Sequence, residues 1–397
     1  MRIMSFGHIP SWAGGKQESG LANVIYQLAK HGSEIPEAEV TLAATDCFVP
    51  QRKDGKLTIV GWTKAGLVGY IAKHPIRAIR SFVTLEALKK LYPVNERLFG
   101  LYLKRIFMDK TIRNLNPQVL HLHGTSAAWY LDLVPNNVKV TVTFHGMSGL
   151  DHNVAQYDVL FKMEHDVFHS AKVKMCFFIC TQLVTLFKTT YGDNNKANRV
   201  IFNAYDNTRF YLEEGVPQSI NKQKITLCTV ASLSDLKGQL RVLKSLSVIP
   251  NRNKFNYFCI GDDSEGISRK MIEFASKNNI IFNYLGKKNP DQIRKELVNA
   301  DYMIMPSSSE GFGLSYLEAI ACGVPVILPK DLPIAVEKNL INEDNSILLD
   351  DSTENAICKV LSQIENYHFD PKVVARSLKD CSWDNIVRQY ISAFNFL

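Results

Sequence analysis

The sequence predicts an α/β protein made of two doubly wound, Rossmann-like domains. Short runs of consecutive apolar residues alternate with amphipathic segments of helix length, as expected for parallel strands whose two faces are both buried by helices. This alternation occurs twice along 397 residues, which is more than one ordinary domain contains. A polar segment with a glycine and a proline, residues 203–224, separates the two series of strands, so we expect the domains to join there.

The expected strands follow one another at the spacing that crossover helices require. In the first half they are Ile3–Phe6, Val40–Ala44, Leu57–Val60, Val119–Leu122, Val138–Phe144, Val173–Cys180 and Arg199–Phe202. In the second half they are Ile225–Ala231, Asn256–Ile260, Ile280–Leu285, Tyr302–Met305, Pro325–Leu328 and Ser346–Leu349. We place the boundary between the two domains at 205/206.

The composition is that of a globular protein with sizeable cores, because 46% of the residues are hydrophobic and 21% are charged. The chain has no apolar run of about 18 residues, and its first residues lack the length and cleavage site of a signal peptide. We therefore expect neither a transmembrane helix nor an export signal. The eight cysteines are scattered, and the nearest two, Cys176 and Cys180, have no second pair to complete a zinc site. They indicate free thiols in a reducing cytosol.

Residues 64–113 form a strongly basic stretch. Its cations are Lys64, Lys73, Arg77, Arg80, Lys89, Lys90, Arg97, Lys104, Arg105, Lys110 and Arg113, and its carboxylates are Glu86, Glu96 and Asp109. Apolar residues are interleaved with these cations, which suits a helix lying on an anionic membrane surface. Two ordinary core-packed helices with a solvated basic face are the other interpretation. The net charge of +7 also suggests nucleic acid as a partner. The sequence carries no recognised nucleic-acid-binding motif, however, so we expect no such partner.

The first loop carries paired glycines. Gly14 and Gly15 follow the first expected strand and precede a helix expected from about Leu21 to Lys30. Glycines before a helix N-terminus can cradle a phosphate with backbone N–H groups. A simple flexible turn explains the same residues, and both interpretations stay open.

Three histidines lie at or near strand ends. His121 and His123 alternate along one expected strand, so their side chains point to one face, and His145 ends the next strand. Because the carboxyl ends of neighbouring parallel strands line one crevice, these rings can hydrogen-bond a sugar hydroxyl or transfer a proton there. Metal binding is disfavoured, since no carboxylate is spaced to complete the ligand set.

Polar residues and glycines also follow the strands of the second half. Lys237 precedes a helix, where it can neutralise a diphosphate as a point charge, although a merely exposed lysine explains it as well. Gly261 ends the next strand and is followed by two aspartates, which suit a metal site or a simple loop equally well. Leu285 ends the strand after that, where backbone atoms can meet the edge of a nucleobase.

The stretch 306–327 is predicted to form a strand end, a glycine loop, a short helix, a tight turn and a buried strand. Gly311 and Gly313 let the backbone approach a ligand closely. The helix expected from Leu314 points its free N–H groups and its positive dipole end at the same loop. Such a helix end binds phosphate without a dedicated cation.

Two carboxylates accompany this loop. Glu310 precedes the helix, and Glu318 lies about one turn inside it, so both can face one cleft at the carboxyl end of a parallel strand. A pair of this kind can serve as acid and base, as in a glycosidase.

These residues resemble the GT-B-fold glycosyltransferases of the large retaining family 4, the glycosyl transferases group 1. The specific part is the family's two-glutamate motif, in which seven residues separate Glu310 from Glu318, followed by the matching segment 322–326. Other residues that fit the family are Gly14, Gly15, His123, His145, Lys237, Gly238, Gly261, Leu285 and Gly286. The resemblance implies two domains facing a central cleft: 1–205 would bind the acceptor and 206–382 the donor. A last helix at about 383–397 would cross back onto the first domain.

The resemblance also implies roles for individual residues. Glu318 would bind the ribose hydroxyls of the donor, Lys237 would neutralise its diphosphate, and Glu310 would lie near the transferred sugar. His123 or His145 would contact the hydroxyls of that sugar near the reacting centre. Further donor contacts would come from Gly14, Gly15, Ser232, Gly261, Leu285, Gly311, Phe312, Gly313 and Leu314. Ser232 stands where the family usually has an arginine, so stabilisation of the leaving group would rest more on Lys237 and the helix dipole.

The implied activity is transfer of a hexose-type sugar, with retention of configuration, from a UDP- or GDP-linked donor to a glycan acceptor. A cation and a helix N-terminus would stabilise the departing diphosphate, so no metal and no other cofactor is expected. The resemblance to enzymes of bacterial surface polysaccharides implies a lipid-linked O-antigen, lipopolysaccharide or capsule precursor as acceptor. We expect the protein in the cytoplasm, peripheral on the inner face of the cytoplasmic membrane through residues 64–113.

Two other functions suit the same architecture. A nucleotide-sugar epimerase would need acid and base carboxylates placed on the sugar ring. A catalytically degenerate protein that only binds nucleotide sugars is disfavoured, because both glutamates and the lysine are present.

Overall fold

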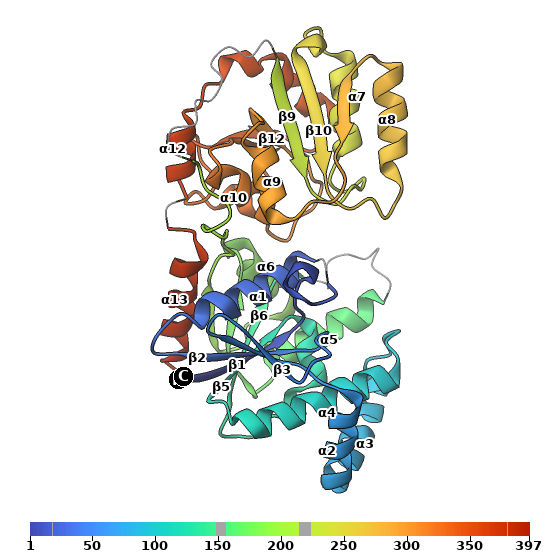
Figure 1. Cartoon of the computed structure of the whole chain (residues 1–397), viewed down its shortest axis with the longest axis vertical. Coiled ribbons are helices and arrows are strands. Elements are labelled where there is room, and N and C mark those ends of the chain that lie inside the picture. The colour runs from blue at the N-terminus through green and yellow to red at the C-terminus, as the bar shows by residue number, and fades with distance from the viewer. Residues whose placement is uncertain (18, 148–155, 214–223, 379) are drawn as a thin grey trace. The chain divides into compact units, whose positions relative to one another are not determined.

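The computed structural model describes residues 1–17, 19–147, 156–213, 224–378 and 380–397, and the chain divides into two compact units (Figure 1). The first unit contains Met1–Asn203 and Trp383–Leu397, and the second contains Ala204–Ser382. This division at 203/204 lies close to the boundary expected at 205/206. Of the expected join, residues 214–223 lie outside the described residues.

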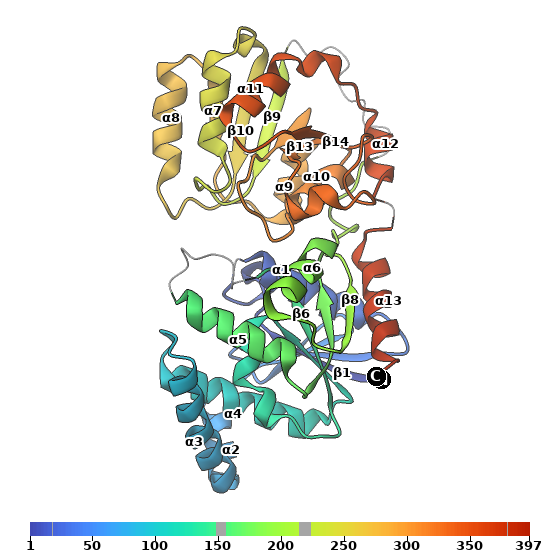
Figure 2. The ribbon, with the colours of Figure 1, turned by 180° about the vertical axis from the view of Figure 1, so that it is seen from behind.

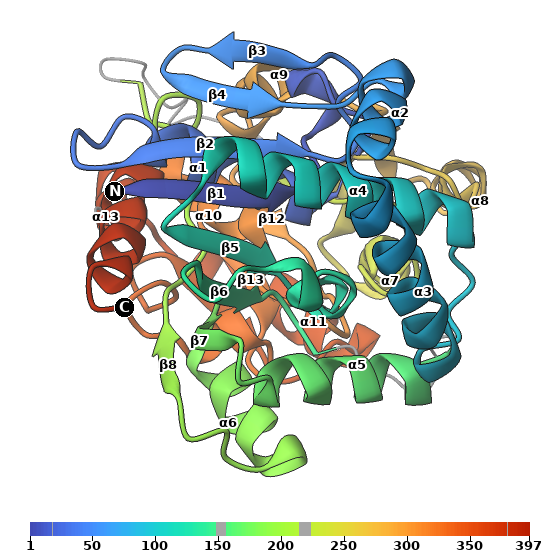
Figure 3. The same cartoon turned by 90° about the horizontal axis from the view of Figure 1, so that it is seen from below.

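The first unit is organised on an eight-stranded sheet in the order β3-β4-β2-β1-β5-β6-β7-β8, which can be followed in Figure 3. The strands are β1 (Arg2–Gly7), β2 (Glu39–Ala44), β3 (Gln51–Asp54), β4 (Leu57–Val60), β5 (Val119–His123), β6 (Lys139–Phe144), β7 (Val173–Phe178) and β8 (Ala197–Val200). All neighbours pair in parallel except β3 and β4. The chain order reverses between β1 and β5, so the loops after these strands meet at a topological switch point.

Strand β3 is the one that the sequence pattern does not predict. Its four residues are all polar, and it pairs antiparallel with β4 at the edge of the sheet. Gly55 closes the hairpin between them with a φ of 59°, a conformation that favours glycine. An exposed edge strand has no buried face, so it leaves no apolar periodicity in the sequence.

The helices of the first unit include the last helix of the chain. They are α1 (Gly20–Gly32), α2 (Lys64–Lys73), α3 (Pro75–Leu91), α4 (Leu98–Leu115), α5 (Tyr157–His169), α6 (Thr181–Tyr191) and α13 (Trp383–Phe394). Helix α13 lies beside α1, where Nδ1 of His31 is 2.8 Å from Oδ1 of Asp384. Its residues 387, 390, 391 and 394 are buried, which is the spacing of a single apolar helix face. That face explains why the last helix belongs to the first unit.

The second unit contains a six-stranded, fully parallel sheet in the order β11-β10-β9-β12-β13-β14. Its strands are β9 (Ile225–Val230), β10 (Phe255–Ile260), β11 (Ile281–Tyr284), β12 (Tyr302–Ile304), β13 (Val326–Pro329) and β14 (Ser346–Leu349). Its helices are α7 (Gln239–Val248), α8 (Ile267–Lys277), α9 (Pro290–Leu297), α10 (Leu314–Ala321), α11 (Glu354–Ser362) and α12 (Pro371–Arg376). The neighbouring helices α7 and α11 can be seen in Figure 2. The predicted doubly wound α/β class is confirmed.

The switch point of the second sheet lies between β9 and β12, where the chain order reverses. Ligands of open α/β sheets bind outside the carboxyl ends of strands at such a point. All eight cysteines are free thiols, and seven of them are buried. No helix in the described part of the chain combines the length and the apolarity that crossing a membrane requires.

Arg105 on α4 is fully buried and paired with a carboxylate. Its Nη1 and Nη2 donate to the two carboxylate oxygens of Asp132 at 2.8 and 2.6 Å, and its Nε donates to the hydroxyl of Ser81 on α3 at 3.3 Å. A planar guanidinium fits this two-pronged contact, whereas an ammonium does not. At least one cation of the basic stretch therefore belongs to the core and not to an external surface.

We expect Arg105→Lys to lower the free energy of unfolding by about 1–2 kcal/mol, because the charge stays but the second prong and the bond to Ser81 are lost. Urea denaturation followed by circular dichroism measures this change. The exposed Arg97→Lys, at the N-cap of the same helix, is the matched control, and it should change stability by less than about 0.5 kcal/mol. Equal stability of the two variants would contradict the core role of Arg105.

Candidate active site

Lys237 and Glu310 meet at the switch point of the second unit. Lys237 lies in the loop after β9 and Glu310 in the loop after β12, and Nζ of Lys237 is 2.5 Å from Oε1 of Glu310. The Glu310 side chain is 9% exposed and the Lys237 side chain 22% exposed. The pair is therefore only partly accessible, and its ammonium remains within reach of an anionic ligand. Two residues that the sequence predicts as separate parts of a site form one charged contact.

Hydrogen bonds tie the two loops together. The carbonyl of Leu236, next to Lys237, accepts from the backbone N–H of Ser308 at 2.9 Å and from the hydroxyl of Ser307 at 3.2 Å. Ser307 is fully buried. The ammonium of Lys237 is thus presented by a braced loop, which limits the conformations that must be ordered when a ligand binds.

Gly238 brings the two loops into direct backbone contact. Its φ is 78°, and a Cβ there would lie 2.7 Å from the carbonyl oxygen of Pro306. The same oxygen accepts a hydrogen bond from Nη2 of Arg241 at 2.7 Å. Only glycine fits this close approach, which explains why a glycine follows the lysine.

Helix α10 begins directly after the loop that carries Glu310. Its N-cap is Gly313, with a φ of 86°, and a glycine has no side chain to cap the first N–H groups of the helix. A Cβ at Gly313 would lie 2.6 Å from the ring of Tyr316, whose hydroxyl donates to the carbonyl of Met305 at 2.7 Å. The start of α10 is thereby anchored to the end of β12. Such a helix end favours an anion such as a phosphate.

The other loop residues predicted to meet the donor differ in exposure. Gly311 is exposed, Leu314 is partly exposed, and Phe312 is buried. The ring of Phe312 therefore belongs to the core, and only its backbone is suited to a ligand contact.

Glu318 lies one turn inside α10 and carries an unusual carboxyl group. Burial, and after it the negative charge of Asp206, raises the pKa of Glu318 to about 7. Asp206 is itself buried and accepts from the backbone N–H and the hydroxyl of Thr208 at 3.0 and 2.6 Å. Within the described residues, the Glu318 carboxyl makes no hydrogen bond or ion pair. It is therefore a free acceptor for hydroxyl groups.

The ends of β9, β10 and β11 are joined by backbone contacts. A Cβ at Gly261 would lie 1.9 Å from the carbonyl oxygen of Ala231, so these strand ends touch. The backbone N–H of Leu285 donates to Cys259 at 2.9 Å, which places Leu285 beside Gly261. Ser232 follows Ala231 and is exposed.

The buried Gln239 holds the start of the Lys237 loop. Its Nε2 donates to the carbonyl of Ser232 at 3.0 Å, and its Oε1 accepts from the backbone N–H of Ser234 at 3.3 Å. A glutamine at the first position of a predicted helix is common on protein surfaces, so the sequence carries no signal for its role.

The glycines of the first loop close a turn in the first unit. The N–H of Gly14 donates to Ser11 and that of Gly15 to Pro10, both at 3.0 Å, and a Cβ at Gly15 would lie 2.0 Å from the carbonyl oxygen of Ile9. In this conformation both N–H groups donate hydrogen bonds within the turn and are not directed at a ligand. The glycines allow close backbone approach, and the phosphate-cradle interpretation would require the turn to open.

Asp46, two residues after the end of β2, holds this loop through hydrogen bonds. Its two carboxylate oxygens accept from the backbone N–H of Ile9 at 3.1 Å and of Lys16 at 3.0 Å. Asp46 is buried, and its role is not predicted by the sequence pattern. Its position one residue after a threonine at a strand end is the only local signal.

The histidines of the first unit separate into two groups. His123 and His145 are in direct contact, with 3.0 Å between Nδ1 of His123 and Nε2 of His145, and Nε2 of His123 is 3.4 Å from the hydroxyl of Ser5. His121 is instead held by the hydroxyls of Thr141 and Thr143 at 2.7 and 3.0 Å. The predicted pair His123 and His145 is thus brought together, whereas His121 belongs to a structural network.

Burial keeps all three imidazoles neutral. It lowers the pKa of His121 to about 3 and that of His145 to about 3, and it lowers the pKa of His123 well below the ordinary value. Neutral rings can donate and accept hydrogen bonds but cannot supply a positive charge. Within the described residues, the buried Nδ1 of His145 has no hydrogen-bond partner, so this chain of rings ends in an atom that suits a ligand hydroxyl.

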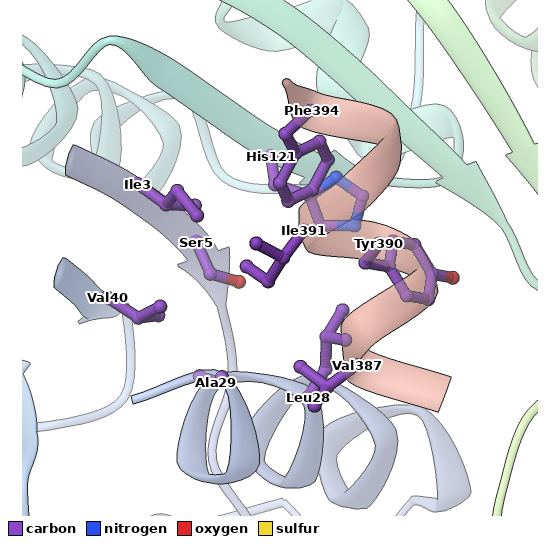
Figure 4. A pocket seen from close by; sticks show the side chains of 11 residues that line it. Ile3, Ser5, Leu28, Ala29, Val40, His121, Val387, Tyr390, Ile391 and Phe394 are labelled. Atoms are coloured by element: carbon purple, nitrogen blue, oxygen red, sulfur yellow. The ribbon is translucent and has the colours of Figure 1, made fainter. Parts of the chain in front are cut away.

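A small cavity lies next to His121 and Ser5, where α13 covers the sheet (Figure 4). Ile391 and Tyr390 of α13 form part of its lining, and its volume is about 20 Å³. This volume holds about one water molecule and is far below that of a typical ligand site. In the part of the chain that the structure describes, no group of three His, Cys, Asp or Glu side chains is arranged to hold a metal ion.

The structure therefore assembles the predicted residues in two groups. Within the second unit it joins Lys237, Glu310, the start of α10 and Glu318. Within the first unit it joins His123 to His145 and places the glycine turn after β1, at the switch point beside β5.

Comparison with known proteins links the residues of this site to a protein family. Residues 213–367, which include Lys237, Glu310 and Glu318, match the sequence model of the family Glycosyl transferases group 1. The O-antigen chain mannosyltransferase B of Escherichia coli is 26% identical over 178 residues, which are 42% of this chain and 45% of that protein. The N,N'-diacetylbacillosaminyl-diphospho-undecaprenol alpha-1,3-N-acetylgalactosaminyltransferase of Campylobacter jejuni is 31% identical over 110 residues, 28% of this chain and 27% of that protein.

The curated relatives match over limited segments, which span 16% to 58% of their length. The structural likeness extends further. The sucrose-phosphate synthase of Thermosynechococcus elongatus superimposes with a TM-score of 0.74 at 15% identity, over 100% of this chain and 98% of that one. The predicted GT-B fold is thus confirmed. Within this fold, residues 213–367 form a domain of the Glycosyl transferases group 1 family.

Proposed function

We propose that this chain is a retaining glycosyltransferase that moves a hexose-type sugar from a nucleotide-diphosphate sugar to a glycan acceptor. The observation that carries the proposal is the contact between Lys237 and Glu310 at the switch point, beside the start of α10. This arrangement offers a cation and a helix N-terminus to the departing diphosphate. Glu318, one turn further, offers a free acceptor for the ribose hydroxyls.

The reaction needs no metal in this proposal. Lys237 and the N–H groups of α10 supply the positive potential that a bound cation supplies in other enzymes, so added chelator should leave turnover unchanged. Glu310 holds the ammonium of Lys237 before the donor arrives and lies near the transferred sugar afterwards. With no carboxylate assigned as a nucleophile, retention is proposed to proceed by departure and attack on the same face of the sugar.

The acceptor is proposed to be a lipid-linked precursor of a bacterial surface glycan, such as O-antigen, lipopolysaccharide or capsule. Support comes from the names of two relatives, one an O-antigen mannosyltransferase and the other a transferase whose named acceptor is an undecaprenol diphosphate glycan. The donor would be UDP- or GDP-linked. The protein would then work at the inner face of the cytoplasmic membrane, with membrane contact through residues 64–113.

A donor screen tests this proposal. The purified chain is incubated with UDP- and GDP-linked hexoses and an undecaprenol-linked glycan, and mass spectrometry follows nucleotide release and acceptor growth. We expect one donor to yield free nucleoside diphosphate together with an acceptor one hexose heavier, with the anomeric configuration of the donor. A nucleotide sugar returned with an altered sugar would instead identify an epimerase, and an inverted product would contradict retention.

A further inference from the structure

Helix α3 presents an apolar stripe to solvent. Ile76, Ile79 and Val83 are 81%, 64% and 59% exposed, and their spacing of three and four residues places them on one side of the helix. The opposite side carries the buried Ala78 and Leu85. Helices α2 and α3 lie together in the first unit, outside its sheet (Figure 1). A stripe of large apolar side chains on the outer side of a helix indicates an interaction surface.

The charges around this stripe are almost all positive. Residues 64–91, which form α2 and α3, contain Lys64, Lys73, Arg77, Arg80, Lys89 and Lys90 and one carboxylate, Glu86. On a helical wheel Arg80 lies beside the apolar stripe, Lys90 continues the stripe toward the C-terminal end of α3, and Glu86 lies at its other edge. Within the described residues, neither of these two cations has a hydrogen bond or an ion pair. The surface therefore offers unneutralised positive charge next to apolar side chains.

The structure separates this surface from the rest of the basic stretch. Arg105 is buried against Asp132, and Arg113 pairs with the buried Asp109 at 3.1 Å, so these cations of α4 serve the core. Of the two interpretations of residues 64–113, core packing describes α4. The outer side of α3 keeps the features of an interfacial helix.

We propose that the outer face of α3, formed by Ile76, Ile79, Val83, Arg80 and Lys90, binds the surface of an anionic phospholipid bilayer. The apolar side chains would enter the boundary between headgroups and acyl chains, and the two cations would lie at the lipid phosphates. Charge complementarity selects this occupant, because the two cations of the face have no ion-pair partner within the described residues and therefore suit the phosphates of a polyanionic plane. The inference deepens the proposed function and rests on it for the presence of a lipid-linked acceptor.

Vesicle co-sedimentation tests the proposal. The full chain is mixed with vesicles of equal parts phosphatidylglycerol and phosphatidylcholine, and with phosphatidylcholine alone. We expect binding to the anionic vesicles that weakens with added salt. Arg80→Ser with Lys90→Ser should lower the partition coefficient by about 30-fold, from two lost lipid contacts. Ile76→Ser, Ile79→Ser and Val83→Ser together should lower it at least about tenfold at any salt concentration.

Matched controls come from the second unit. Val248→Ser with Ile272→Ser removes two exposed apolar side chains, and Lys270→Ser with Lys277→Ser removes two exposed cations. Both controls should bind vesicles as the unaltered chain does. Retained circular dichroism and retained nucleotide affinity would show that the α3 variants are folded.

The outcomes distinguish this surface from the proposed activity. Absence of vesicle binding, or equal binding by the α3 variants and the unaltered chain, overturns the surface and leaves donor turnover as a separate question. Vesicle binding as expected without turnover of any donor overturns the activity instead. A change of oligomeric state in the apolar α3 variant, measured by sedimentation velocity, would reassign the face to a second copy of the chain and also overturn the proposal.

Discussion

Lys237→Ala is expected to lower kcat for sugar transfer by about 10²–10³-fold, with a much smaller change in KM for the donor. In the proposed reaction the ammonium of Lys237 would act on charge that grows on the leaving diphosphate, so its contribution would be larger in the transition state than in the bound donor. The family resemblance implies an arginine at the position of Ser232, so we expect the reaction to depend more strongly on Lys237. Steady-state kinetics with the donor identified by the screen measure both constants.

Lys244→Ala is the matched control for this variant. Lys244 lies on the helix that follows Lys237, and its ammonium pairs with Glu354 at 3.2 Å in an exposed contact. We expect its kcat to stay within about twofold of the unaltered chain. An unchanged kcat in Lys237→Ala would show that the diphosphate is stabilised elsewhere, and the assigned site would then be wrong.

Glu318→Ala is expected to raise KM for the donor by about 10–100-fold, because hydrogen bonds from the ribose hydroxyls to a carboxylate are lost. The effect on kcat should be small, since ribose is remote from the bond that breaks. Glu343→Ala, an exposed glutamate of the same unit, is the control and should leave KM unchanged. A KM unaffected by Glu318→Ala would exclude this carboxyl from donor binding.

The raised pKa of Glu318 gives this prediction a pH dependence. With a pKa of about 7, the carboxyl is largely protonated below neutrality, and only the ionised form accepts from two hydroxyls. KM for the donor should therefore fall as the pH rises from about 6 to about 8. Glu318→Gln cannot ionise, so this dependence should disappear in that variant.

The same pKa affects stability. Between the ordinary carboxyl pKa and about 7, the folded state binds more protons than the unfolded state, so the free energy of unfolding falls as the pH rises. Glu318→Gln removes this term. We expect it to be more stable than the unaltered chain at about pH 8, by roughly 1–3 kcal/mol, and equally stable at about pH 4. Denaturation midpoints at the two pH values measure the difference.

The sequence predicts most of the fold because buried parallel strands leave continuous apolar runs. The strands of both sheets, apart from β3, lie at or close to these apolar runs. The last helix has apolar residues on one side, which matches its place in the first unit. Strand β3 escaped this reasoning, since it is polar and exists only through pairing at the sheet edge. Local sequence patterns indicate which residues are buried, and no residue of the edge strand β3 is buried.

The candidate site was predictable to the extent that its residues follow strands. Lys237, Glu310 and Glu318 lie in loops or a helix at the carboxyl ends of β9 and β12, which the alternation of strands and helices indicates. Asp46, Gln239 and Asp206 were not predicted. Asp46 and Asp206 act on residues far away in the chain, and Gln239 holds a nearby loop through its side-chain amide. None of these roles leaves a periodic pattern in the sequence.

By itself the sequence determined the α/β class, the two series of strands and the two-glutamate stretch with its glycines, because each depends on residues that are near one another in the chain. Only the tertiary structure decided that Lys237 and Glu310, 73 residues apart, form one ion pair. It also decided that burial and the charge of Asp206 raise the pKa of Glu318 to about 7, and that Arg105 turns inward while Ile76 turns outward. Distances between distant residues and the side of a helix that meets its neighbours are set by packing, and packing is a property of the whole fold.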